Sequence, residues 1–316
     1  MNTLKSLKSL AGAFLAFVKQ DFHYGAYIYT FVFIAVCVFI NYFFGFYQNI
    51  LRPSYAHDNA MWVYPLFYAF IYFAAAIPVL LLQKEYKTLK NPRFYLKSLF
   101  FIVIYGVSIG FYKYRQWEFP ELFYLERNFV YRITAELKSI VFIVIPLIFV
   151  KLLIDRKTVK GFYGLSWNSK HLDAYLIVFI VMLPVLAATS FTPDFVKAYP
   201  QFRPWHYDGI FNLSALEKTL IFETAYSLDF VVTELFFRGA LIIGLCSIMG
   251  PKTILPMVAF YVSIHFGKPV AETISSMFGG YILGVLAYQT KHIWGGIFVH
   301  IGIALTMEIM GFIRYY

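Results

Sequence analysis

Long apolar runs recur along the chain and are separated by short polar connections. A helix needs about 20 apolar residues to cross about 30 Å of hydrocarbon. Runs of about that length lie at residues 26–47, 61–82, 97–112, 137–154, 173–191, 216–248, 252–266, 270–289 and 293–313. The pattern predicts an all-α fold, namely a polytopic transmembrane helical bundle with eight or nine spans.

The sixth run differs from the others because charged residues interrupt it. These residues are Glu217, Lys218, Glu223, Asp229, Glu234 and Arg238. Charged side chains inside a membrane are costly and usually face protein. We therefore expect this segment to be sheltered by other helices and to be broken or partly interfacial.

Composition supports a membrane protein and changes the interpretation of the charge. The chain has 316 residues, of which 60% are hydrophobic and 14% are charged, and its net charge is +10. The basic residues lie mainly in short connections between apolar runs, where they report orientation, so no nucleic-acid partner is expected. We expect an integral protein of the bacterial inner (cytoplasmic) membrane, in contact with the lipid bilayer, with a cytoplasmic amino terminus.

The ionisable residues divide the chain into two parts within one membrane domain. Residues 1–214 are expected to form amino-terminal transmembrane helices and interfacial loops. Within them, the mixed charges of residues 113–138 predict an amphipathic interfacial helix. Residues 215–316 hold most of the charges that fall inside apolar runs, so we expect them to form the functional core.

Four polar residues in apolar surroundings are the strongest site candidates: Glu234, Arg238, His265 and His300. Glu234 and His265 each lie about 15 residues from a turn near 250–251, which is roughly 20 Å along each helix. The two side chains are therefore predicted to face each other. His300 is about seven residues into its run, nominally 10 Å deep, and does not match that level.

A carboxylate and two histidines can activate water in two ways. They can act directly as general acid and base, or they can bind a divalent metal such as zinc, with Glu234, His265 and His300 as candidate ligands. The residue types do not decide between a metal and none. A structural alternative is that Glu234 and Arg238 form an ion pair that holds the bundle, while each histidine bonds a backbone carbonyl.

Residues 215–312 resemble the CAAX protease and bacteriocin-processing family, also called CPBP or Abi. Its motifs are E-E-x-x-x-R, F-x-x-x-H and H-x-x-x-N. The matching runs are T-E-L-F-F-R-G at 233–239, F-Y-V-S-I-H at 260–265 and I-W-G-G-I-F-V-H at 293–300, with G-G-Y-I-L-G at 279–284 between the histidines. The resemblance implies a relative of the type II CAAX prenyl endopeptidase, an intramembrane protease.

In that family, the first glutamate and the middle histidine activate water, and the last histidine and the asparagine stabilise the oxyanion. This chain departs from the pattern, because Thr233 replaces the first glutamate, Tyr261 replaces the aromatic Phe and Ala304 replaces the asparagine. Asp229, one helical turn before Thr233, is a candidate substitute base.

Three functions remain open, and the sequence favours neither of the first two. The first is an intramembrane endopeptidase that cuts a membrane-embedded or lipidated peptide, with catalytic candidates Glu234, Arg238, His265, His300 and Asp229. The second is a catalytically degenerate relative that binds a membrane peptide or partner protein as an immunity or scaffold protein. A transporter is the third and less favoured, because no inverted repeat is visible.

Overall fold

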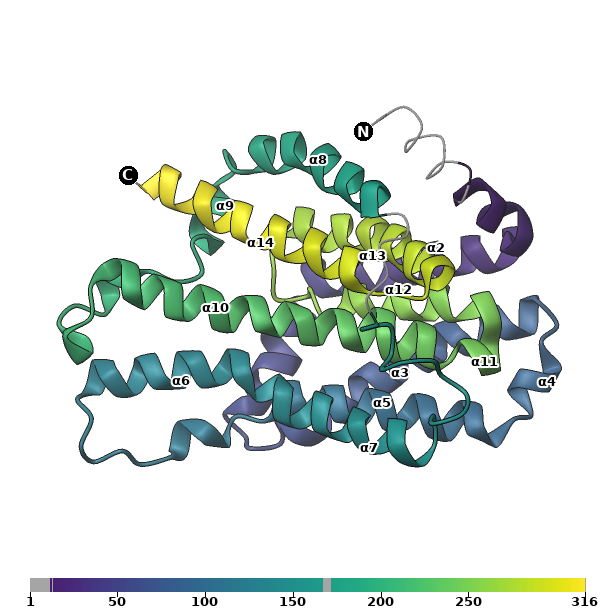
Figure 1. The fold of residues 1–316 in the computed structure, drawn as a ribbon, viewed down its shortest axis with the longest axis horizontal. Coiled ribbons are helices and arrows are strands. Elements are labelled where there is room, and N and C mark those ends of the chain that lie inside the picture. The colour runs from purple at the N-terminus through teal and green to yellow at the C-terminus, as the bar shows by residue number, and fades with distance from the viewer. Residues whose placement is uncertain (1–11, 13, 167–171, 316) are drawn as a thin grey trace.

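The computed structural model describes residues 12, 14–166 and 172–315, and the regular elements of this part are helices (Figure 1). The α-helices are α2 (Tyr24–Phe43), α3 (Ala60–Leu82), α4 (Tyr86–Leu89), α5 (Pro92–Gly110), α6 (Tyr124–Ser139), α7 (Ile145–Leu153), α8 (Leu172–Thr189), α9 (Pro193–Ala198), α10 (Ala215–Glu234), α11 (Cys246–Met249), α12 (Ile254–Ser263), α13 (Val270–Thr290) and α14 (Trp294–Tyr315). In the described part, eight helical segments are long and apolar enough to cross a membrane. The predicted all-α bundle is confirmed.

Most of the segment predicted as an interfacial helix, 113–138, is helical, and its helix α6 continues toward the next apolar run. Helix α6 continues through a short π-helical stretch, Ile140–Val144, into α7, so that Tyr124–Leu153 is one segment of 30 residues. At 1.5 Å per residue it is about 45 Å long and exceeds the hydrocarbon thickness. Helix α6 lies along α10 (Figure 1). Part of the polar surface of α6 therefore packs against another polar helix, and an interfacial position for α6 stays a prediction.

The sixth segment is sheltered, as expected, but it is not broken near its charges. Helix α10 continues into a π-helical segment, Leu235–Gly244, in which every residue is buried. The chain then reverses near Gly250, whose φ of +59° suits a residue without a side chain. Because α12 follows this reversal, the sixth and seventh predicted runs fall within one long apolar segment, Ala215–Ser263.

The π-helical segment is packed in the middle of the bundle by α5, α12 and α13. Aromatic rings from four helical segments meet around Phe236. Tyr105 stacks on Phe236 with ring centroids 4.5 Å apart, and Phe260 packs edge-on to Phe237 at 5.2 Å and against Tyr68 at 4.9 Å. Such pairs stabilise a fixed geometry. The segment that carries Arg238 is therefore held by rigid neighbours.

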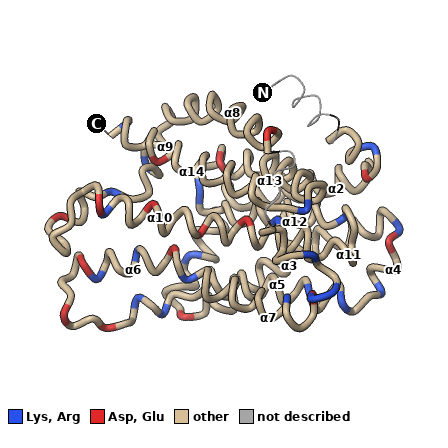
Figure 2. Tube along the Cα trace, viewed as in Figure 1, with Lys and Arg blue, Asp and Glu red and all other residues tan. Residues whose placement is uncertain are grey.

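The charged residues have an uneven distribution (Figure 2). Lys and Arg gather near α4 and the end of α7, whereas many Asp and Glu residues lie along α6, α10 and the adjoining loops. This is the asymmetry from which a cytoplasmic amino terminus is predicted. The orientation itself stays a prediction. The basic residue Lys97 is buried and has a structural role described below.

Candidate functional site

A buried ion pair lies at the junction of α10 and the π-helical segment. Arg238 Nη1 donates to Glu234 Oε1 at 2.8 Å, and both side chains have no exposed area. Removing one member of such a pair leaves an uncompensated buried charge and typically costs about 3–5 kcal/mol. The charge content of this segment is thus explained by mutual neutralisation inside the protein.

The same carboxylate oxygen binds a histidine from α14. His300 Nδ1 lies 2.9 Å from Glu234 Oε1, and the histidine side chain is 15% exposed. The carboxylate accepts this bond, so Nδ1 carries a proton and Nε2 is the nitrogen left to face a reactant. Arg238, Glu234 and His300 form one connected chain of contacts, which we call the Glu234 triad.

The depth mismatch expected for His300 is absent, because α14 begins inside the protein. The backbone N–H of Ile293 donates to the carbonyl of Gly164 at 3.1 Å, and the indole N–H of Trp294 donates to the carbonyl of Leu165 at 3.0 Å. Ile293 has no exposed area. The loop before α8 therefore holds the first turn of α14 at a depth that apolar run length does not reveal.

Close approach of α14 to the triad depends on a glycine. A Cβ atom at Gly296 would lie 2.3 Å from Glu234 Oε2. Glu234 Oε2 and the Arg238 atoms Nε and Nη2 are buried and make no hydrogen bond to the described part of the chain. Unsatisfied buried polar atoms are rare in native proteins and are more frequent at functional sites. The triad thus has the features of a site rather than of a saturated structural bridge.

Tyr261 of α12 connects the triad to the second histidine. The guanidinium carbon of Arg238 lies 4.3 Å from the centre of the Tyr261 ring, a cation–π contact. The Tyr261 hydroxyl is 3.4 Å from His300 Nε2. The ring of His265 packs edge-on against the same tyrosine at 4.9 Å. Four polar candidates and this tyrosine therefore occupy one region.

His265 lies in the turn after α12, and its orientation is fixed by the backbone. Its Nδ1 is 2.8 Å from the carbonyl oxygen of Tyr261, which can only accept, so Nδ1 is the donor. In the neutral ring, Nε2 then has a free lone pair. The sequence predicts that Glu234 faces His265. In the structure Glu234 bonds His300, and His265 reaches the triad through Tyr261.

The structure does not bring the candidate base Asp229 to the triad. Its charged and polar neighbours include Glu136, Lys138 and Ser139 of α6, and Tyr105 of α5. It thus lies on the side of α10 that meets α6. Two of the three residues that depart from the motif pattern, Thr233 and Ala304, are buried, and neither carries a carboxylate or an amide.

The metal alternative lacks the required donor set. Zinc sites need three or four nitrogen, sulfur or oxygen ligands that converge on one point. Among residues 12, 14–166 and 172–315, no group of three or more His, Cys, Asp and Glu residues is placed to hold a metal ion. Glu234 and His300 are joined to each other, and His265 is turned to the Tyr261 carbonyl. In the described part of the chain, Glu234, His265 and His300 are therefore not placed as a set of three zinc ligands.

Sequence reasoning missed a second buried ion pair that supports the site. Lys97 Nζ donates to Asp155 Oδ1 at 2.7 Å and to the carbonyl of Gly244, the last residue of the π-helical segment, at 2.6 Å. The Tyr163 hydroxyl donates to Asp155 Oδ2 at 2.7 Å. No pattern signals this, because a lysine and an aspartate beside basic loops look like ordinary surface residues.

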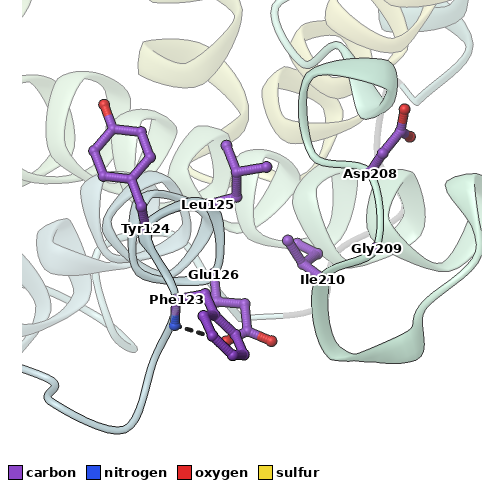
Figure 3. Close-up of a pocket in the computed structure, with 7 residues that line it drawn as sticks. All are labelled: Phe123, Tyr124, Leu125, Glu126, Asp208, Gly209 and Ile210. Atoms are coloured by element: carbon purple, nitrogen blue, oxygen red, sulfur yellow. Dashed lines mark hydrogen bonds between the residues drawn. The ribbon is translucent and has the colours of Figure 1, made fainter.

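A surface pocket lies away from the triad, between the start of α6 and the loop at 208–210 (Figure 3). Of its two carboxylates, Glu126 and Asp208, the first accepts the backbone N–H of Phe123 at 3.0 Å and that of Phe211 at 3.1 Å. Both oxygens are thus used to cap α6 and to hold the loop. We assign this pocket a structural role.

Comparison with known proteins gives one result. Residues 217–306 match the family described as type II CAAX prenyl endopeptidase Rce1-like. No curated protein and no solved structure matches the chain. The matched segment contains Glu234, Arg238, His265 and His300, the four candidates found from the sequence. Together with the eight apolar helical segments, this match makes the chain a membrane protein that is related to the CAAX protease family and resembles a CAAX protease.

Proposed function

We propose that the chain is an intramembrane endopeptidase that hydrolyses a peptide bond in a membrane-embedded or lipid-modified peptide. The observation that carries this proposal is the Glu234 triad, in which one buried carboxylate oxygen holds both Arg238 at 2.8 Å and His300 Nδ1 at 2.9 Å. A carboxylate behind an imidazole fixes its orientation and can balance a positive charge on it. A purely structural ion pair does not need the histidine.

His265 is the proposed base. Because its Nδ1 is occupied by the Tyr261 carbonyl at 2.8 Å, the lone pair on Nε2 can take a proton from water. The water oxygen then bonds to the carbonyl carbon, and the carbonyl π pair moves onto the oxygen. When the tetrahedral intermediate collapses, the C=O bond re-forms and the C–N bond breaks. The amine takes the proton from His265, so one peptide and one water give a carboxylic acid and an amine.

His300 is the proposed electrophile. Its Nε2 does not contact the Glu234 carboxylate. When the His300 ring is protonated, Nε2 would donate a hydrogen bond to the carbonyl oxygen of the peptide, and Glu234 would balance the positive charge of the ring. Arg238 is a positioning residue in this scheme, since it holds Glu234 in place. Removing a single oxyanion donor typically lowers kcat by about 10²–10³, so His300 is expected to matter at that level or above.

The substrate class follows from the surroundings of the site and from the family match. The triad is buried within segments that suit a bilayer, so a peptide must reach it from the membrane. The matched family is described as a CAAX prenyl endopeptidase, which supports a lipid-modified peptide. A bacterial inner membrane and a cytoplasmic amino terminus remain part of the proposal.

A second candidate function has one specific observation in its favour. Thr233 and Ala304 stand where a carboxylate and an amide would serve the reaction in the motif pattern, and Asp229 is turned to α6. A relative that keeps the triad and binds a membrane peptide or a partner protein without cutting it would look the same. Cleavage is what separates the two.

The test is cleavage of a mixed library of membrane peptides by the purified protein in detergent. We expect wild type to produce fragments, His265→Ala and Glu234→Ala to produce none, and Asp229→Ala, the matched control, to behave as wild type. If wild type is inactive and the double variant Thr233→Glu/Ala304→Asn gains activity, the chain is the non-cutting relative. Inactivity of all variants would contradict the protease proposal and leave a binding function.

A further inference from the structure

The Tyr261 hydroxyl occupies a position that the roles assigned so far do not use. It lies 3.4 Å from His300 Nε2, the nitrogen proposed to meet the carbonyl oxygen. The tyrosine is 5% exposed. A buried phenol normally finds a hydrogen-bond partner, and here its neighbours are the site's own electrophile and the Arg238 guanidinium rather than a structural carbonyl.

The ring that carries this hydroxyl is firmly placed. Arg238 lies over its face at 4.3 Å, and Phe237 packs edge-on at 5.0 Å. A Cβ atom at Gly280 of α13 would lie 2.9 Å from Tyr261 Cδ1, so the glycine lets α13 close against the ring. A donor that is fixed in advance needs no reorganisation during the reaction, which is the property that makes electrostatic stabilisation effective.

The chemistry calls for a second donor at this point. The negative charge on a tetrahedral intermediate is commonly stabilised by two hydrogen-bond donors, and a tyrosine hydroxyl is an established type of donor. On α14, residue 304 is one turn after His300 and would share its face, but Ala304 has only a methyl group. Among the described polar side chains, the Tyr261 hydroxyl is the one found in contact with His300 Nε2.

We infer that the Tyr261 hydroxyl is a catalytic hydrogen-bond donor, which acts beside His300 Nε2 on the carbonyl oxygen of the bond to be cut. The inference rests on the proposed endopeptidase function. In this arrangement the carbonyl oxygen enters between the two groups and accepts from both. The hydroxyl supplies the stabilisation that Ala304 cannot give, which explains how a site without an amide at position 304 can still work.

The experiment compares Tyr261→Phe with Tyr72→Phe on a peptide that wild type cleaves. Phe keeps the ring, its contact with Arg238 and nearly its volume. Tyr72 is a matched control because it is fully buried and its hydroxyl contacts the sulfur of Met249, at 3.6 Å, and the Ser98 side chain, neither of which belongs to the Glu234 triad. We expect Tyr261→Phe to lower kcat by about 10²-fold with KM within twofold of wild type, and Tyr72→Phe to change neither.

A kcat of Tyr261→Phe above half the wild-type value would overturn the inference while leaving the protease proposal intact. An inactive wild type would instead remove the proposal on which it rests. If Tyr261→Phe does not fold, as judged by its unfolding curve in detergent, site-specific fluorotyrosine at 261 replaces it, because it preserves shape and makes the phenol more acidic. Activity should then fall at a lower pH than in wild type, and an unchanged pH profile would refute the role.

Discussion

Substitution of Gly296 by alanine tests the geometry of the triad directly. The added methyl group would lie 2.3 Å from Glu234 Oε2, whereas carbon and oxygen atoms in contact need about 3.5 Å. The carboxylate or α14 must therefore move by about 1 Å. A shift of this size in either element stretches the 2.9 Å contact between Glu234 and His300.

Gly296→Ala is expected to affect both stability and the rate of cleavage. Overpacking of a buried site typically costs about 1–3 kcal/mol of stability, and a misplacement of about 1 Å can cost about 10²-fold in rate. We expect Gly296→Ala to remain folded, to unfold at a lower temperature than wild type and to lose about 10²-fold in kcat.

The assay is peptide cleavage together with thermal unfolding in the same detergent. Gly279→Ala is the control, because a Cβ atom at Gly279 of α13 would meet no atom within 4 Å, and alanine is a better helix former than glycine. It should leave activity unchanged and raise stability slightly. If Gly296→Ala cleaves as fast as wild type and unfolds at the same temperature, the close approach of α14 to Glu234 is not a feature of the molecule.

Three further substitutions separate the roles of the buried charges. Arg238→Met should lower the free energy of unfolding by about 3–5 kcal/mol, measured by denaturant titration. Adding Glu234→Gln to this variant should recover much of the lost stability, whereas additive losses would argue against the ion pair. Lys97→Met should cost a similar amount, whereas Lys90→Met, at the surface, should cost under 0.5 kcal/mol; equal effects would contradict the buried bridge. Asp229→Asn should change kcat by less than threefold, whereas a loss of kcat near 10²-fold would show that Asp229 belongs to the catalytic site.

The sequence was sufficient for the fold class, and it singled out four polar residues, Glu234, Arg238, His265 and His300, that the structure brings into one region. Apolar run length predicted eight or nine spans, and the described residues contain eight segments long and apolar enough to cross a membrane, with the sixth run and most of the seventh in one segment. Glu234 and Arg238 stood out because charges are rare in such runs. This kind of signal depends only on composition and spacing.

The geometry of the site was less predictable, because it depends on where helices begin. Counting residues placed His300 too shallow, because the hydrogen bond from the Ile293 N–H to the Gly164 carbonyl holds the start of α14 inside the protein. Counting could not show that Asp229 faces α6, or that Tyr261 lies between both histidines. Each of these facts is decided by contacts between segments distant in the sequence, which periodicity does not encode.

The central claim is that water is activated at this site to cut a peptide bond. The most direct test is cleavage of a membrane peptide in ¹⁸O-labelled water, followed by mass spectrometry of the new carboxyl terminus. Wild type should place one ¹⁸O atom in that carboxyl group during each cleavage, and His265→Ala should give no labelled product. An absence of cleavage by wild type, or equal labelling by both proteins, would contradict the account.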